Sequence, residues 1–168
     1  TSLFMRDFGL LEVNKTICHR SEVGSANGLS NARGLATIYS PLANDGKHNG
    51  SQFISKSAVA EMSTLSTISA EDYTLLVPTR FGPGFMLSTD NRKLEKAPNS
   101  SVILGRRAFG HVGAGGSIGF ADPDCRMSFG YVMNKMGVGL MLNQRGQSLV
   151  DAAYQSLGLS TTESGYWE

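Results

Sequence analysis

The chain has 168 residues, a length that suits one domain with enough chain to bury a core. Its hydrophobic content of 40% and its charged content of 17% exclude a disordered segment. The formal net charge of +1 gives no general attraction to nucleic acid or to an anionic membrane surface, and no run of about 18 apolar residues could form a transmembrane helix.

The first seventy residues predict a connection followed by helices. Residues 1–24 show no clear periodicity, so we expect a connection from a region that precedes this sequence. Residues 25–70 are expected to be helical. Within them, the segment from Ser55 to Leu65 predicts a short helix that has Ser55 as its N-cap and Val59 and Met62 facing inward.

A longer helix comes before that one and has clear start and stop signals. Ser30 or Asn31 can cap it, and Asp45-Gly46 can close it. Pro41 is unfavourable inside a helix because it has no N–H to donate, so it predicts a kink or an early end near Ser40. Apolar residues follow at helical spacing, at Leu35, Ile38, Tyr39 and Leu42.

Residues 71–136 predict strands. Two apolar runs come first, with Pro78 and Pro83 confining them to edges, ends or bulges. A polar loop from Ser88 to Ser101 separates these runs from the later strands. The expected strands are Tyr73–Val77, Phe81–Leu87, Arg107–Gly113, Gly116–Ala121 and Met127–Asn134.

A last helix is expected within residues 145–158. It spans Gln147 to Leu157, and Gly158 is its stop. Its predicted buried stripe consists of Leu149, Val150, Tyr154 and Leu157. The order of helices, strands and helix predicts a single domain with an antiparallel sheet covered by helices, an α/β fold of the α+β type.

The most informative stretch runs from Phe109 to Asn134, and its first part is rich in glycine. Because glycine has no Cβ, it lets a backbone pass close to another group, as a strand beside a substrate must do. The glycines are Gly110, Gly113, Gly115 and Gly116, on either side of His111. We interpret the segment as a wall of an active site. We reject a dinucleotide loop, because Ile118 stands where its third glycine would be and a strand follows instead of a helix.

Three motifs in this stretch resemble the C-terminal motif block of the serine β-lactamase-like hydrolases. They are Gly-His-Val-Gly-Ala-Gly-Gly at 110–116, Gly-Phe-Ala-Asp-Pro at 119–123 and Phe-Gly-Tyr-Val-Met-Asn at 129–134. The β-lactamase-related carboxylesterases, which share the class C β-lactamase fold, are the most similar branch. A weaker likeness at 26–36, 42–46 and 81–87 extends the resemblance over roughly residues 20–160. It implies the C-terminal part of the β-lactamase/transpeptidase-like fold.

The resemblance also implies what chemistry to look for. The family's nucleophile is the serine of a Ser-x-x-Lys motif, and a tyrosine is its second proton-transfer group. No lysine of this chain has a serine three residues before it, and no tyrosine stands in a matching loop, so no catalytic residue is recognisable. We therefore expect the C-terminal part of a longer hydrolase of ester or amide bonds, inactive alone. The alternative is a non-catalytic domain used for assembly or partner binding.

The resemblance places three residues beside the substrate: His111, Gly113 and Ala114. His111 would orient the substrate or adjust proton positions; the alternative is a histidine satisfied by neighbouring backbone. The Ala114 N–H would be one of two donors to the oxyanion, and the alternative is that it pairs with a neighbouring strand.

No cofactor and no metal are expected. The three histidines are unpaired in sequence, and Cys18 and Cys125 are predicted to be two buried or partly buried thiols. Asp122 and Asp124 are interpreted as turn residues. The expected partners are a small ester or amide substrate and an N-terminal half, a companion chain or a second copy, without nucleic acid or a membrane span. The compartment stays open, with a soluble cytoplasmic protein slightly favoured.

Overall fold

The computed structural model describes residues 14–24, 28–97 and 99–168. The chain divides into two compact units, residues 1–30 and residues 31–168. The described part of the first unit contains helix α2 (Thr16–Arg20). The rest of the predicted N-terminal connection, residues 1–13, lies outside the described residues.

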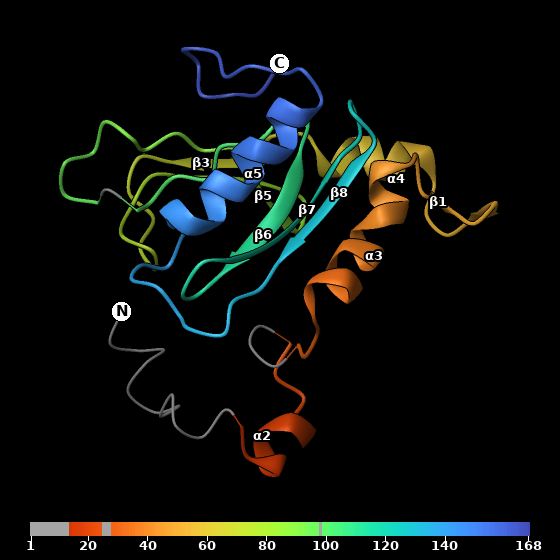
Figure 1. Ribbon diagram of the computed structural model, residues 1–168, viewed down its shortest axis with the longest axis horizontal. Coiled ribbons are helices and arrows are strands. Elements are labelled where there is room, and N and C mark those ends of the chain that lie inside the picture. Colours follow the sequence, from red (N-terminus) through yellow and green to blue (C-terminus); the bar gives the residue numbers. More distant parts are fainter. Residues whose placement is uncertain (1–13, 25–27, 98) are drawn as a thin grey trace. The chain divides into compact units, whose positions relative to one another are not determined.

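An antiparallel sheet of six strands forms the centre of the second unit (Figure 1). Its strands lie side by side in chain order, each antiparallel to the next. Antiparallel neighbours need only short connections, which is why this order can follow the chain. The strands are β3 (Thr67–Ser69), β4 (Thr79–Gly82), β5 (Phe85–Leu87), β6 (Phe109–Gly113), β7 (Ser117–Asp122) and β8 (Met127–Tyr131).

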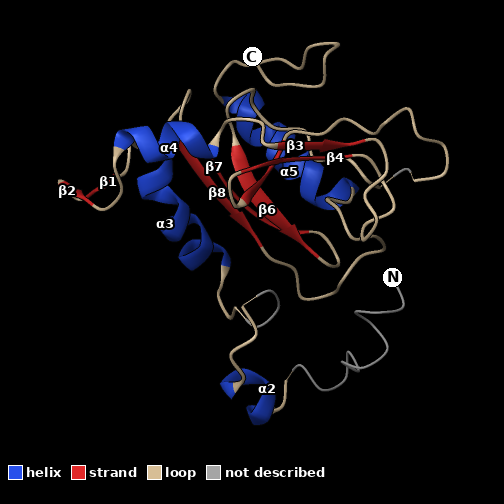
Figure 2. Ribbon diagram, turned by 180° about the vertical axis from the view of Figure 1, so that it is seen from behind, coloured by secondary structure: helices blue, strands red, loops and turns tan. Residues whose placement is uncertain are grey.

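Helices cover both faces of this sheet (Figure 2). On one face α3 (Ala32–Ala43) and α4 (Lys56–Met62) pack through Tyr39, Leu42, Ala43 and Val59 onto Leu87, Phe109 and Ala121. On the other face α5 (Gln144–Ser156) packs through Val150 and Tyr154 onto Val112, Ile118 and Phe120. Successive strand residues point to opposite faces, so β7 places Phe120 in one core and Ala121 in the other. A short hairpin of β1 (Lys47–His48) and β2 (Ser51–Gln52) lies outside the sheet.

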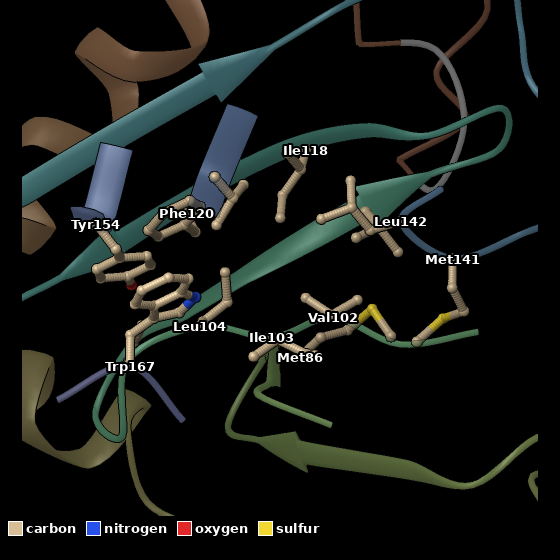
Figure 3. Close-up of a cluster of buried hydrophobic side chains, with 13 residues drawn as sticks. Met86, Val102, Ile103, Leu104, Ile118, Phe120, Met141, Leu142, Tyr154 and Trp167 are labelled. Carbon is tan, nitrogen blue, oxygen red and sulfur yellow. The ribbon is translucent and has the colours of Figure 1, made fainter. Parts of the chain in front are cut away.

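Stacked aromatic rings join α5 to the sheet (Figure 3). The Tyr154 ring lies 5.4 Å from that of Trp167 and 6.0 Å from that of Phe120. The Tyr154 hydroxyl donates to Asp122 Oδ2 over 2.7 Å and accepts from the Gly105 N–H. Asp122 is therefore more than the turn residue that we expected: it ends β7, is 2% exposed and holds the helix to the sheet.

The helices differ from expectation in two respects. Pro41 does not end α3 near Ser40, because it lies in the last turn, where its missing N–H removes at most one helical hydrogen bond. In α5 the buried stripe is Gly146, Val150 and Tyr154, at a spacing of four residues. Leu149 and Leu157 flank that stripe and are about half exposed, so their predicted burial was wrong.

Two of the expected strands were also wrong. Tyr73–Val77 is a turn, because the Asp72 carboxylate accepts the N–H groups of Thr74 and Leu75. Phe81–Leu87 is not one strand but the hairpin of β4 and β5, which turns at Pro83-Gly84 with Gly84 at φ 81°.

Candidate functional site at the β6–β7 hairpin

The three predicted site residues lie at the end of β6 and in the turn that follows it. His111 and Gly113 are on β6, opposite Gly119 and Ser117 of β7. Ala114 begins the three-residue turn between the two strands. The structure therefore brings all three together on one hairpin.

The His111 side chain is exposed, although its strand is central in the sheet. Its Nδ1 lies 2.7 Å from the carbonyl oxygen of Val112. A carbonyl oxygen only accepts, so Nδ1 carries the hydrogen in this contact and Nε2 is left as the acceptor. The ring centroid is 6.4 Å from that of Phe81. The arrangement leaves one basic nitrogen for a ligand or a proton.

The Ala114 backbone lies beside an open length of strand edge. β5 pairs with β6 only at Phe109 and Gly110, so the later residues of β6 are not paired with β5. Within the described residues, the exposed Ala114 N–H donates no hydrogen bond. An acceptor that approaches along this edge would meet a fixed, unused donor.

The two glycines of the turn let its backbone lie close to a later segment of the same chain. Gly115 and Gly116 have φ angles of 87° and 102°, which residues with a side chain rarely adopt. A Cβ on Gly115 would lie 2.7 Å from Met136, and one on Gly116 would lie 2.2 Å from Asn143. The close approach that we predicted from these two glycines is therefore to residues 136–143 and not to a substrate.

Asn143 fixes the conformation of the turn from the start of α5. Its Nδ2 donates to the Gly115 carbonyl oxygen over 2.8 Å, and its Oδ1 accepts from the Gly146 N–H as the N-cap of the helix. The Gly137 N–H donates to the same Gly115 oxygen over 2.9 Å. The position of the Ala114 N–H is thus fixed by the β6–β7 turn itself and by the bonds that Gly137 and Asn143 make to that turn.

Tyr39 of α3 is a residue at this site that sequence reasoning placed only in a helix stripe. It is 8% exposed, and burial raises the pKa of its hydroxyl, an effect that the nearby backbone of His111 partly offsets. Its ring lies where a Cβ on Gly119 would be, at 2.5 Å. The stripe indicated that Tyr39 is buried, but its partner is 72 positions away and no local pattern could reveal it.

The described residues offer no group of three or more His, Cys, Asp or Glu side chains that could hold a metal ion. Cys18 and Cys125 are both of intermediate burial. Burial, with a smaller contribution from the Asp122 charge, raises the pKa of Cys125 to about 12. Its thiolate is too scarce near neutral pH for Cys125 to act as a nucleophile. Among the helices described, none has the length and apolar character needed to cross a membrane.

Residues 4–154 match the model of the family described as Beta-lactamase. The chain belongs to the β-lactamase family. This confirms the resemblance seen in its motifs and, with the structures below, the expected antiparallel α+β fold.

Curated and solved members of the β-lactamase family are longer than this chain. The chain is 35% identical over 116 residues to the esterase/β-lactamase LipL of Mycobacterium tuberculosis, covering 69% of this chain and 24% of that protein. It is 37% identical to a family VIII carboxylesterase of known structure, with a TM-score of 0.61, covering 75% of this chain and 31% of the other. A penicillin-binding protein homologue from Caulobacter crescentus is 32% identical with a TM-score of 0.61, at 74% and 31% coverage. The chain thus spans about a quarter to a third of the length of these relatives.

Proposed function

We propose that this chain is the C-terminal part of a serine hydrolase that cleaves ester or amide bonds through an acyl-enzyme. The nucleophilic serine and lysine would lie in a region outside this sequence, since no Ser-x-x-Lys occurs in it. The names of the relatives support an esterase or a β-lactamase-like hydrolase. The observation that carries the proposal is the pair of an exposed His111 imidazole and an unused Ala114 N–H on one hairpin.

In the proposed reaction the serine oxygen attacks the substrate carbonyl carbon, and the carbonyl oxygen becomes an oxyanion. The Ala114 N–H and the N–H of the nucleophile would donate to this oxyanion, each worth about 3 kcal/mol of transition-state stabilisation. The oxyanion collapses, the bond from the carbonyl carbon to the leaving oxygen or nitrogen breaks, and the alcohol or amine leaves with the proton that the serine hydroxyl gave up. Water then attacks the acyl-enzyme and releases the acid. His111 would face the substrate, with Nε2 able to accept a hydrogen bond from it.

A second candidate is a non-catalytic domain of the same fold that binds another protein. It is favoured by exposed apolar side chains outside the hairpin: Ile38 on α3 is 65% exposed and Phe53 is 66% exposed. Apolar side chains of this size are common at interfaces. The two candidates differ in one measurable property, which is ester hydrolysis once a nucleophile is supplied.

The experiment joins this chain to an N-terminal region that carries Ser-x-x-Lys, as a second chain or as one longer chain. Hydrolysis of a p-nitrophenyl ester should appear, and His111→Ala should lower turnover while the melting temperature changes little, because the side chain is exposed. His48→Ala is the matched control, because it removes a histidine that lies outside the β6–β7 hairpin. This chain alone should not react with a fluorophosphonate.

Ala114→Pro tests the oxyanion donor, because proline has no N–H. It should reduce turnover by about a hundredfold or more, whereas Ala114→Gly keeps the N–H and should retain most activity. Circular dichroism and melting must show an intact fold in both variants. A folded Ala114→Pro enzyme with full activity would remove Ala114 from the site, and stoichiometric labelling of a serine in this chain would overturn the proposed division of roles.

A further inference from the structure

A cavity of about 620 Å³ lies on a part of the second unit that the hydrolytic site does not use. Its lining comes from β3 and β4, from residues 88–91 after β5 and from residues 164–166 near the end of the sequence. No residue of β6 or of its turn contributes to it. Part of the lining is apolar, with Ile68, Ala70 and Pro78 beside the Tyr166 ring.

Arg80 is the cationic side chain of this cavity, and none of the described carboxylates forms an ion pair with it. Its Nε is buried and has no hydrogen-bond partner within the described residues. The guanidinium carbon lies 5.8 Å from the centroid of the Tyr166 ring, a cation–π contact that holds the group over the lining. The structure therefore presents a positioned guanidinium with unused donors.

The carboxylate that also lines the cavity does not neutralise Arg80. Asp90 is taken by Arg92, whose Nε donates to Oδ1 over 2.9 Å and whose Nη2 donates to Oδ2 over 2.7 Å. That ion pair holds the pKa of Asp90 below its usual range, so the pair stays ionised at neutral pH. Arg80 is left as the uncompensated charge of the cavity.

A second arginine contacts the Tyr166 ring but, unlike Arg80, has a carboxylate partner. The Arg106 guanidinium carbon lies 4.9 Å from the Tyr166 centroid, on a side chain that is paired with Glu168. Tyr166 thus contacts two guanidinium groups, of which one has its carboxylate partner and the other does not.

The serine and threonine hydroxyl groups of the lining are already engaged with the chain. Thr79 Oγ1 donates to Asp72 Oδ2 over 3.3 Å, and Thr89 Oγ1 donates to the Leu87 carbonyl oxygen over 3.0 Å. Ser88 Oγ accepts from the Leu104 N–H over 2.9 Å and lies within hydrogen-bond distance of two carbonyl oxygens. Arg80 is consequently the charged donor of the lining that has no hydrogen-bond partner at Nε among the described residues.

We propose that this cavity binds the carboxylate of a small amphipathic acid, with Arg80 as the group that recognises it. The planar guanidinium fork matches the two oxygens of a carboxylate, and one cation balances one negative charge. The apolar residues beside it would bury the hydrocarbon or aromatic body of the acid, as in ligand sites that combine apolar walls with few polar groups. A phosphate dianion fits less well, because a single guanidinium leaves much of its charge unpaired.

Calorimetric titration of the chain with benzoate tests this site without reference to hydrolysis. Benzamide is the matched ligand, since it has nearly the same shape and no charge. Benzoate should bind, benzamide should bind at least about tenfold more weakly, and Arg80→Gln should weaken benzoate by about tenfold or more. Arg106→Gln changes the other arginine on Tyr166 and should alter the benzoate affinity by no more than about twofold.

Arg80→Lys provides a second variant in case Arg80→Gln does not fold, because it keeps the charge and loses the bidentate geometry. It should weaken benzoate while its melting curve matches that of the unchanged chain. Equal affinities for benzoate and benzamide, no heat with benzoate, or unchanged binding in the folded Arg80 variants would each overturn the proposal. Tighter binding of inorganic phosphate than of benzoate would overturn the assignment to a carboxylate.

Discussion

Cys125 shows how the neighbours of one side chain determine its chemistry. Its pKa of about 12 leaves only a very small thiolate fraction at pH 8, whereas the thiol of an unfolded chain is substantially ionised there. We predict that iodoacetamide modifies Cys125 about a thousandfold more slowly in the folded chain than in urea, followed by mass spectrometry of the peptide that contains it. Modification at the unfolded rate would contradict this environment.

The raised pKa of Cys125 also determines how the stability of the fold changes with pH. A thiol whose pKa is raised in the folded state contributes fully to the stability of the fold at any pH below its unfolded pKa, near 8.5. That stabilisation is lost as the pH rises toward 12. Cys125→Ser should therefore lose stability less steeply than the unchanged chain between pH 9 and pH 11.

At Gly116 a side chain is disfavoured for two reasons at once. It has a positive φ, and a Cβ would lie 2.2 Å from Asn143 Nδ2. Gly84 also has a positive φ but nothing within 4 Å of its missing Cβ. A substitution of Gly84 therefore measures the free-energy cost of the positive φ alone. We predict that Gly116→Ala lowers the free energy of unfolding by about 1–3 kcal/mol more than Gly84→Ala, measured by urea denaturation. Equal losses would show that Asn143 moves aside at no cost.

For single residues, the sequence predicted which positions are unusual but not which residues they contact. The glycines around His111 were recognised as sites of close approach, yet the approach at Gly115 and Gly116 is to residues more than 20 positions later. Tyr39 was expected in a buried stripe, and its hydroxyl contact with the His111 backbone depends on how α3 crosses the sheet. Such contacts arise only from tertiary packing, which no local pattern specifies.

Among the elements, the N-cap residue of α5 has a second role beyond capping the helix. Asn143 is 7% exposed and binds both the Gly146 N–H and the Gly115 carbonyl oxygen. Asn31 caps α3 at an exposed position through a bond to the Gly34 N–H. Asn143→Ala should cost about 2 kcal/mol of unfolding free energy and Asn31→Ala about 1 kcal/mol, because Asn143 is buried and its loss also leaves the Gly115 carbonyl oxygen with fewer donors.

Urea denaturation of both variants measures this difference, and the order of the two losses is the decisive result. If Asn31→Ala were the more costly change, the link from α5 to the β6–β7 turn would carry little energy. In an active longer enzyme, Asn143→Ala should also lower turnover, since the turn that Asn143 holds carries the Ala114 N–H.

Elements with a clear periodicity or cap signal were the ones predicted correctly. The structure begins α4 after the Ser55 cap, as expected, places β6 and β8 within the expected strands, and shifts β7 by one residue, to Ser117–Asp122. β3 was missed, because its three residues are mostly exposed and give no alternating pattern. Tyr73–Val77 has the composition of a strand, but the Asp72 carboxylate satisfies its first N–H groups and turns the chain.

At the scale of the whole molecule, the sheet ends in two edges. β3 and β8 are its outer strands, and within the described residues neither pairs with a further strand. Unpaired edge groups can pair with another chain, and exposed apolar side chains favour the same outcome. Ile68 lies on the β3 edge and is 66% exposed. If the rest of the enzyme lies outside this sequence, as proposed, it is the natural occupant of such edges.

We therefore predict that the chain alone self-associates in solution, with a mass by light scattering that increases with concentration. Ile68→Lys places a charge on the edge of β3 and should shift the mass toward that of a monomer. Ile38→Lys adds the same charge to α3 at a position of nearly equal exposure, 65%, and should change the mass less, because the backbone groups of a helix are already paired and offer no edge to another chain. Supplying the N-terminal region should replace the association by one defined complex, since both would compete for the same edges. A compact monomer at every concentration would contradict the prediction and would favour a chain that needs no partner.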